Sequence, residues 1–124
     1  MGIANNISDL ARWMGLDENA TFTYVKVATI AATPFVLKAL LVGSYTRLHG
    51  LFGTLTAADT LTIEDSSGTD LSGAMPVGTH GGFVIPYCRD KDGCLRSAIS
   101  KGISLLTPVS TFHGYAIVSQ STTP

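Results

Sequence analysis

Two cysteines, Cys88 and Cys94, are the side chains of this 124-residue sequence with the clearest capacity for chemistry. They flank the five residues 89–93, four of which are charged, as is typical of a solvated turn. A zinc site needs about four ligands, and a thioredoxin-like centre has a C-x-x-C spacing, so the pair fits neither. We interpret the cysteines as facing residues at the base of a β-hairpin, reduced or joined as a disulfide. An intersubunit disulfide and a catalytic thiol are the weaker alternatives.

The other ionisable side chains form no catalytic pattern in the sequence. His49, His80 and His113 stand on or beside separate predicted strands, outside any metal-binding motif. No nucleophile elbow or P-loop is present. Most carboxylates lie in or beside predicted turns, where aspartate serves local hydrogen bonding; they are Asp59, Glu64, Asp65, Asp70, Asp90 and Asp92. The sequence therefore predicts a protein that is not an enzyme and binds no cofactor or metal ion.

Alternating apolar residues predict β-strands from Thr21 onwards. In the segment 60–65, for example, Leu61 and Ile63 alternate with polar residues, which indicates a strand with one solvent-exposed face. Turn residues separate such segments, a pattern that indicates an all-β sandwich or a small barrel of about seven or eight antiparallel strands. The predicted strands are 22–30, 50–57, 60–65, 81–87, 94–100 and 111–119.

Two segments carry proline at informative positions. The segment 33–43 begins with Thr33-Pro34 and ends with Gly43, which also fits a helix; a strand fits the sheet better, and we favour it. Pro86 lies within the strand predicted at 83–87. Because proline cannot donate a ladder hydrogen bond, this strand is expected at a sheet edge or beside a bulge.

The first 20 residues follow a different period. Apolar residues recur there at spacings of three and four, which predicts a short amphipathic helix over 8–14 that is marginal on its own. We therefore divide the chain into an arm (1–20), a β-sandwich domain (21–120) and a polar tail (121–124). The arm docks either on its own domain or on a partner, with Trp13 as the anchor in the second case. The predicted contact residues are Ile3, Ile7, Leu10, Trp13, Met14 and Leu16.

Composition points to association between subunits. Charged residues make up 14% of the chain, against about 25% in an ordinary soluble domain, so much of the surface is expected to be buried against other subunits. The net charge of −1 and the scattered 8 basic residues argue against nucleic acid as a partner. No membrane span is expected, since the best apolar run, 35–42, is short and contains Lys38. No secretory signal is visible.

The segment 53–87 resembles small virion proteins of tailed bacteriophages, and more specifically capsid decoration (cement) proteins. The likeness is carried by the alternating strand TLTIED, the turn SSGTDLSGAMP, the strand GGFVIPY and the final FHGYAIVS. The resemblance implies a β-sandwich or jelly-roll module that binds the major capsid protein on the outer capsid surface, with a homotrimer favoured over a dimer. It also implies synthesis in the host cytoplasm and no catalytic residues.

A tail, fibre or carbohydrate-binding β-sandwich module is the alternative function. Such a module would present exposed aromatic side chains in one concave patch. The candidates in this sequence are Tyr45, Phe52, Tyr87 and Tyr115.

Overall fold

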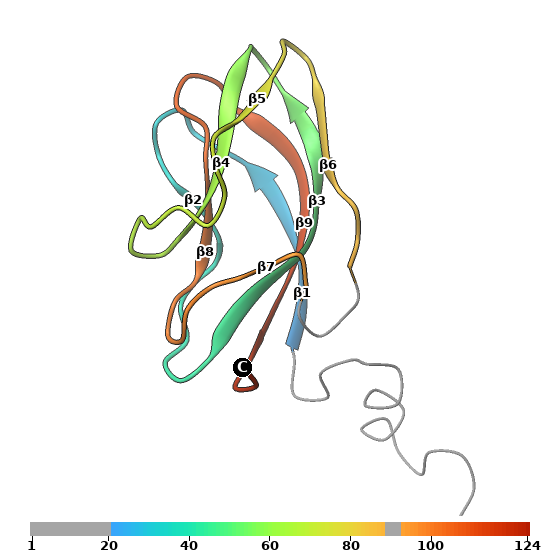
Figure 1. Cartoon of the computed structure of the whole chain (residues 1–124). Helices are drawn as coiled ribbons and strands as arrows, with labels where there is room; N and C mark the ends of the chain where they lie inside the picture. Colours follow the sequence, from blue (N-terminus) through green and yellow to red (C-terminus); the bar gives the residue numbers. More distant parts are fainter. Residues whose placement is uncertain (1–20, 89–92) are drawn as a thin grey trace, which may run out of the picture.

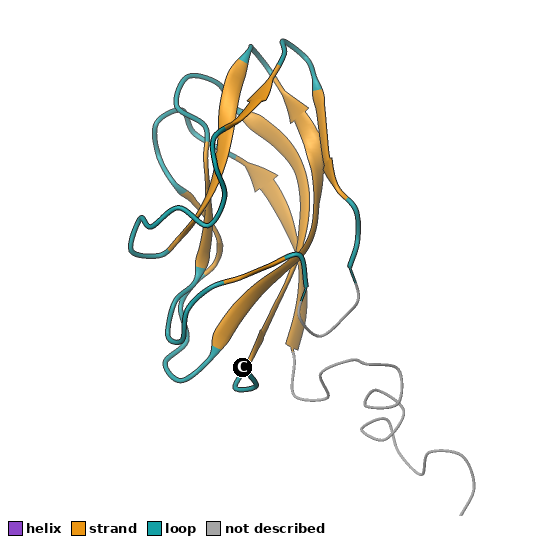
Figure 2. Cartoon of the chain, in the orientation of Figure 1, coloured by secondary structure: helices purple, strands orange, loops and turns teal. Residues whose placement is uncertain are grey.

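The computed structural model describes residues 21–88 and 93–124, which form two antiparallel β-sheets packed face to face (Figure 1). All regular elements of this part are strands (Figure 2). The five-stranded sheet contains β1 (Thr21–Ala28), β3 (Tyr45–Leu55), β6 (Gly82–Ile85), β7 (Leu95–Arg96) and β9 (Phe112–Ser121). The four-stranded sheet contains β2 (Phe35–Lys38), β4 (Asp59–Asp65), β5 (Met75–Val77) and β8 (Ile103–Leu106).

The strand order is that of a jelly roll. One sheet has the order β1-β9-β3-β6, with β7 also paired to β3, and the other has the order β2-β8-β4-β5. Strand β1 pairs with β9, β2 with β8, β3 with β6, and β4 with β5. Each strand of the first half of the chain thus pairs with one of the second half, as in a long hairpin wound into two Greek keys. The predicted all-β sandwich is confirmed.

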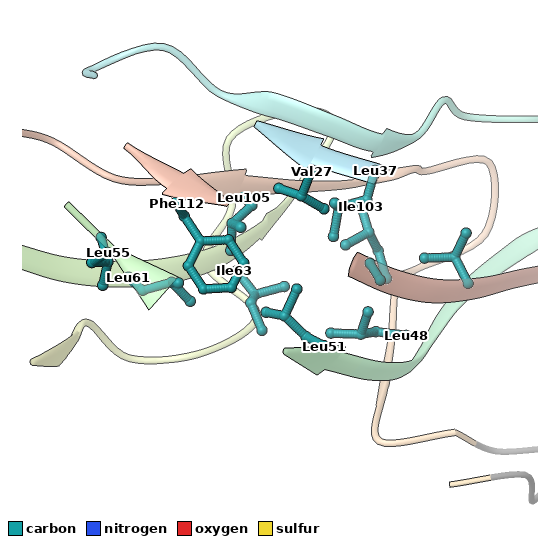
Figure 3. Packing of buried hydrophobic residues seen from close by; sticks show 12 residues of the cluster. Val27, Leu37, Leu48, Leu51, Leu55, Leu61, Ile63, Ile103, Leu105 and Phe112 are labelled. Atoms are coloured by element: carbon teal, nitrogen blue, oxygen red, sulfur yellow. The ribbon is translucent and has the colours of Figure 1, made fainter. Parts of the chain in front are cut away.

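The core lies between the sheets and is built from alternate residues of the long strands. Figure 3 shows buried side chains of both sheets meeting in this space. The predicted alternation is confirmed on β3, where Leu51 and Leu55 are buried while Phe52 and Thr54 are exposed. The buried apolar residues are Val27, Leu37, Leu48, Leu51, Leu55, Leu61, Ile63, Ile103, Leu105, Phe112, Ala116 and Val118.

Two glycines allow β3 and β9 to approach closely beside the largest ring of the core. Gly53 and Gly114 are register partners on these strands. A Cβ atom at Gly114 would overlap the carbonyl oxygen of Phe52, and one at Gly53 would lie 2.7 Å from Cζ of Phe112. The ring of Phe112 therefore occupies space that any side chain at Gly53 would fill.

Both proline-bearing segments follow the predictions, except that Pro86 lies just outside its strand. Within 33–43, the residues Phe35–Lys38 form β2. Strand β6 ends at Ile85, directly before Pro86, and lies at the edge of its sheet. The edge position suits proline because no further strand requires its missing N–H.

Other segments differ from the predictions. The residues Ile103–Leu106 form the unpredicted strand β8, which shows no alternation because three consecutive residues are buried. The strand expected over 94–100 is limited to Leu95–Arg96. There the Ser97 hydroxyl donates to the Ala98 carbonyl at 2.8 Å, and Ile99 lies exposed in the following turn.

The C-terminal strand is longer than predicted. Strand β9 includes Ser121, which was expected to begin the polar tail. The amide of Gln120 donates to the carbonyl of Ala39 at 2.6 Å, and Nη1 of Arg47 donates to Oγ of Ser121 at 3.0 Å. These bonds hold polar residues of β9 in buried positions.

Candidate functional site

Exposed aromatic and apolar side chains cover the outer face of the five-stranded sheet. The register places Phe52 of β3 between Tyr115 of β9 and Val84 of β6. Tyr115 lies opposite Lys26 of β1, so Tyr24 is its diagonal neighbour. We call the following residues the aromatic face: Phe22, Tyr24, Phe52, Val84 and Tyr115.

The aromatic face is exposed across four neighbouring strands. Tyr24 is 77% exposed and Val84 is 66% exposed. The rings of Phe52 and Tyr115 have centroids 5.5 Å apart and planes inclined at 30°. Singly exposed apolar residues are ordinary, but a contiguous group of this kind marks a contact surface.

A second apolar surface lies at one end of the sandwich. The loop between β2 and β3 exposes Leu40, Leu41 and Val42, the last to 81%. Its backbone is tied to the loop after β7, because the Gly43 N–H donates to Oγ of Ser100 at 2.9 Å. Three consecutive exposed apolar residues are unusual without a function. We call the group Leu40, Leu41, Val42 and Ile99 the apolar tip.

The apolar tip lies at the end of the sandwich where β1 begins. Figure 1 shows this end at the bottom, with the C-terminus beside it. The predicted helix over 8–14 and all arm contact residues lie outside the described residues; these contact residues are Ile3, Ile7, Leu10, Trp13, Met14 and Leu16. The arm therefore joins the domain at the end that carries the apolar tip.

The two cysteines lie together, but not in a hairpin. Their Sγ atoms are 2.7 Å apart. Strands β6 and β7 both pair antiparallel with β3, and therefore run in the same direction along one edge of it. The hairpin prediction is wrong because the segments on either side of the loop hydrogen-bond to β3 instead of to each other.

The backbone at both cysteines is anchored on the same strand. The Cys88 N–H donates to the His49 carbonyl, and the Cys94 N–H donates to the Leu48 carbonyl, each at 2.7 Å. Gly93 has a φ of 64°, a conformation that favours glycine. A Cβ atom on Gly93 would also lie 2.9 Å from the Leu48 carbonyl oxygen.

His49 is buried in this region, which the sequence did not indicate. It lies where the register of β3 shifts between Leu48 and Gly50. Its Nδ1 is 2.7 Å from the Cys88 carbonyl oxygen, and its Nε2 is 2.6 Å from Oγ of Ser119. The ring of Phe22 lies against it, with centroids 4.7 Å apart. His49 thus links the cysteine pair to the aromatic face.

The other two histidines, His80 and His113, are exposed. His80 lies in the turn before β6 with a φ of 54°. His113 lies on the outer face of β9, with Nε2 3.2 Å from Oγ1 of Thr111. In the described residues, no group of three or more His, Cys, Asp or Glu side chains could hold a metal ion.

Asp59, the first residue of β4, joins this strand to the loop before β9 through a hydrogen-bonded clamp. Its Oδ2 accepts hydrogen bonds from the N–H of Val109 at 2.9 Å and from the N–H and hydroxyl of Ser110 at 2.8 and 2.9 Å. The N–H of Thr60 donates to Oδ1 at 2.7 Å. Desolvation alone would raise the pKa of Asp59, but these hydrogen bonds outweigh it, and the pKa is lowered. The predicted local role holds only for the bond from Thr60. The bonds from Val109 and Ser110 join Asp59 to a segment about 50 positions later in the chain.

Glu64 differs from the prediction of an exposed strand face. It is buried beside Asp65, at the end of β4. Desolvation raises the pKa of Glu64, and the charges of Asp70 and Asp65 raise it further. Desolvation also opposes ionisation of Asp65, but hydrogen bonds from Ser67 and Thr69 and the charge of Lys101 leave its pKa lowered.

The structure brings together only some of the candidate sugar-contacting aromatics. Phe52 and Tyr115 are neighbours, and Tyr87 is exposed beyond the end of β6. Tyr45 is half-buried, with the guanidinium of Arg96 4.8 Å from its ring centroid. Seven positions separate Tyr45 from Phe52 on β3, which corresponds to roughly 20 Å along a strand.

Comparisons with known proteins bear on the fold alone. No family model matches the chain, and no curated protein matches it. Among solved structures, a protein from Bacillus endospore appendages, described as forming a novel family of disulfide-linked pili, is similar with a TM-score of 0.46 and 13% sequence identity. The similarity covers 89% of this chain and 94% of that one. None of the described residues forms a helix long and apolar enough to cross a membrane.

Proposed function

We propose that the chain is a structural virion protein that binds the outer surface of a phage capsid as a homo-oligomer, with a trimer favoured, and stabilises the shell. The jelly roll supports this proposal because viral capsid proteins use it, although lectins and cupins do so too. A fold alone does not decide function. The observation that carries the proposal is the aromatic face, which spans β1, β9, β3 and β6 and lacks a partner among the described residues.

The aromatic face is suited to contact with a second copy of the chain. The backbone N–H and C=O groups of its central strands, β9 and β3, are already paired within the sheet, so covering these strands costs little polar desolvation. Burial of apolar surface contributes about 25 cal/mol per Å², and tyrosine is enriched among the residues that dominate interface energies. Lys26 and His113 are the charged or titratable neighbours on this face and would lie at its rim.

The end that carries the apolar tip is assigned to the shell. Strand β1, which follows the arm in the sequence, begins at this end (Figure 1). We therefore assign the apolar residues of the arm and the apolar tip to the same partner. Several such ends in one oligomer would bind neighbouring capsid subunits together. Multivalent attachment of this kind retains a protein strongly even when each contact is weak.

The test compares two variants by light scattering during size-exclusion chromatography. Phe52→Thr/Tyr115→Thr replaces the ring pair of the aromatic face with β-branched residues, which suit strands. The control, Val36→Thr, removes an exposed apolar side chain from the other sheet. We expect the double variant to dissociate to monomers and the control to remain an oligomer. A wild-type protein that is monomeric at all concentrations, or a double variant that stays assembled, would contradict this assignment.

The Phe52–Tyr115 pair also favours the alternative function, a carbohydrate-binding module of a tail or fibre. Exposed rings 5.5 Å apart could stack against a sugar. A glycan array separates the two proposals. Saturable binding by the wild type that is lost in Phe52→Thr/Tyr115→Thr would favour the carbohydrate module, and its absence together with capsid binding would favour the virion protein.

A further inference from the structure

The cysteine pair is held in place by main-chain bonds that do not depend on sulfur chemistry. Cys88 and Cys94 donate their N–H groups to consecutive residues of β3, His49 and Leu48. The chain on either side of the pair is also bound to β3, through β6 at Leu51 and through β7 at Leu48. Cys88 and Cys94 therefore lie on one interrupted edge strand, held beside each other along β3.

The sulfur atoms are directed at each other within this frame. The two Sγ atoms are 2.7 Å apart, and both side chains are half-buried. Cys94 Sγ also lies 3.6 Å from the carbonyl oxygens of His49 and Pro86, while Cys88 Sγ lies 3.5 Å from that of Pro86. Each thiol thus has the other as its nearest reactive neighbour among the described residues.

We propose that Cys88 and Cys94 form an intrachain disulfide that closes the loop 89–93 at its base when the protein meets a disulfide oxidant such as oxidised glutathione. One thiolate attacks oxidised glutathione, forms a mixed disulfide and releases one reduced glutathione. The second cysteine then attacks the mixed disulfide and releases the other. Overall, two protein thiols and one oxidised glutathione give one protein disulfide and two reduced glutathione molecules.

The surroundings of the thiols favour one order of attack. Burial, together with the neighbouring Cys88, raises the pKa of Cys94 to about 12. Cys94 therefore supplies little thiolate near neutral pH, and because the thiolate is the nucleophile, the first attack is assigned to Cys88. Cys94 then resolves the mixed disulfide, helped by its fixed position beside Cys88.

The same geometry argues against a disulfide between subunits. Both sulfurs are half-buried at the base of the insertion, and each would have to leave its partner at 2.7 Å to reach another chain. The intrachain disulfide would join β6 to β7 and fix the Cys88 carbonyl, which is 2.7 Å from Nδ1 of His49. The inference holds whether or not the chain binds a capsid.

The experiment treats the full-length reduced protein with oxidised glutathione and follows it by intact mass. We expect a mass lower by about 2 Da, loss of both alkylatable thiols, and a single-chain band on a non-reducing gel. The melting temperature should rise by about 5 °C, a modest gain because the closed ring is small. Peptide mapping should recover the Cys88–Cys94 bond.

Three variants serve as matched controls. In Cys94→Ser, Cys88 should accumulate a stable glutathione adduct, whereas Cys88→Ser should form its adduct more slowly near neutral pH. Cys88→Ser/Cys94→Ser should melt at the same temperature with and without the oxidant. Two thiols that remain alkylatable after oxidation, or disulfide-linked dimers of the wild type, would overturn the proposal.

Discussion

At the residue scale, Asp59 makes the most concentrated set of polar contacts in the described structure. Replacing it with alanine leaves the N–H groups of Val109 and Ser110 without their acceptor. We expect Asp59→Ala to lower the free energy of unfolding by about 2 kcal/mol, measured by urea denaturation. The control is Asp70→Ala, at an exposed carboxylate. Equal stability of Asp59→Ala and the wild type would show that the clamp contributes nothing.

Replacing Glu64 is expected to stabilise the folded protein, whereas replacing Asp59 is expected to destabilise it. Because its pKa is raised in the folded state, the unfolded chain loses this proton first as pH increases, and stability falls above pH 4.5, the ordinary pKa. Glu64→Gln removes the buried charge, so it should melt at a higher temperature than the wild type at pH 7. The gain should vanish at pH 3.5, where Glu64 is neutral in both the folded and the unfolded wild type. A variant less stable than the wild type at pH 7 would refute this account.

Single residues were predictable where their role is local. Asp65 accepts hydrogen bonds from Ser67 and Thr69 of the turn that follows it, as expected for a carboxylate beside a turn. Glu64 and His49 were not predictable. The alternation rule exposes Glu64, but the chain folds back beside it at Asp70. His49 is buried because the register of β3 shifts there, and no sequence pattern predicts that shift.

At the scale of elements, the pairing of β3 with β9 depends on two facing glycines. Gly114→Ala would push a methyl group against the Phe52 carbonyl, in the middle of the longest strand pair. We expect a loss of about 2–3 kcal/mol in the free energy of unfolding, as for overpacked cores. The control, Gly78→Ala, meets no atom within 4 Å and should change stability by less than about 0.5 kcal/mol. Similar stabilities for the two variants would contradict the close approach.

Strands were predictable from the sequence where one face of the strand is exposed to solvent. Strand β1, the second half of β3 and the first half of β9 alternate and were located from the sequence. The first half of β3 was not predicted, and the residues 46–51 are all buried. Strand β8 was missed because Ile103, Ser104 and Leu105 are all buried, so no alternation marks it. The cysteine hairpin was wrongly predicted for a related reason. A charged loop between two short strands looks the same whether they pair with each other or with a third strand.

At the scale of the whole molecule, the strand pattern indicated a sandwich, and its jelly-roll winding was named only through the resemblance. The jelly-roll order joins β1 to β9 and β2 to β8, and these pairings link segments far apart in the chain. Local patterns specify which residues face the core, whereas the partner of each strand is decided by the packing of all of them. The aromatic face likewise became apparent only when four strands lay side by side.

The arm provides a prediction about shell attachment. Leu10→Ser/Trp13→Ser, made in the full chain, removes two predicted contact residues and leaves the aromatic face intact. We expect this variant to keep the oligomeric mass of the wild type but to lose binding to empty phage heads in a co-sedimentation assay. The control is Val36→Ser, on the four-stranded sheet. Unimpaired binding by the arm variant would show that other surfaces attach the protein.

The central claim is that the chain assembles with copies of itself and with a viral shell. Sedimentation velocity of the purified wild type, alone and mixed with empty heads of the phage that on this proposal encodes it, tests this most directly. We predict a species of about three times the chain mass of 13.0 kDa when alone, and its transfer to the fast-sedimenting head fraction in the mixture. A 13.0 kDa monomer that stays in the slow fraction when heads are present would contradict the account.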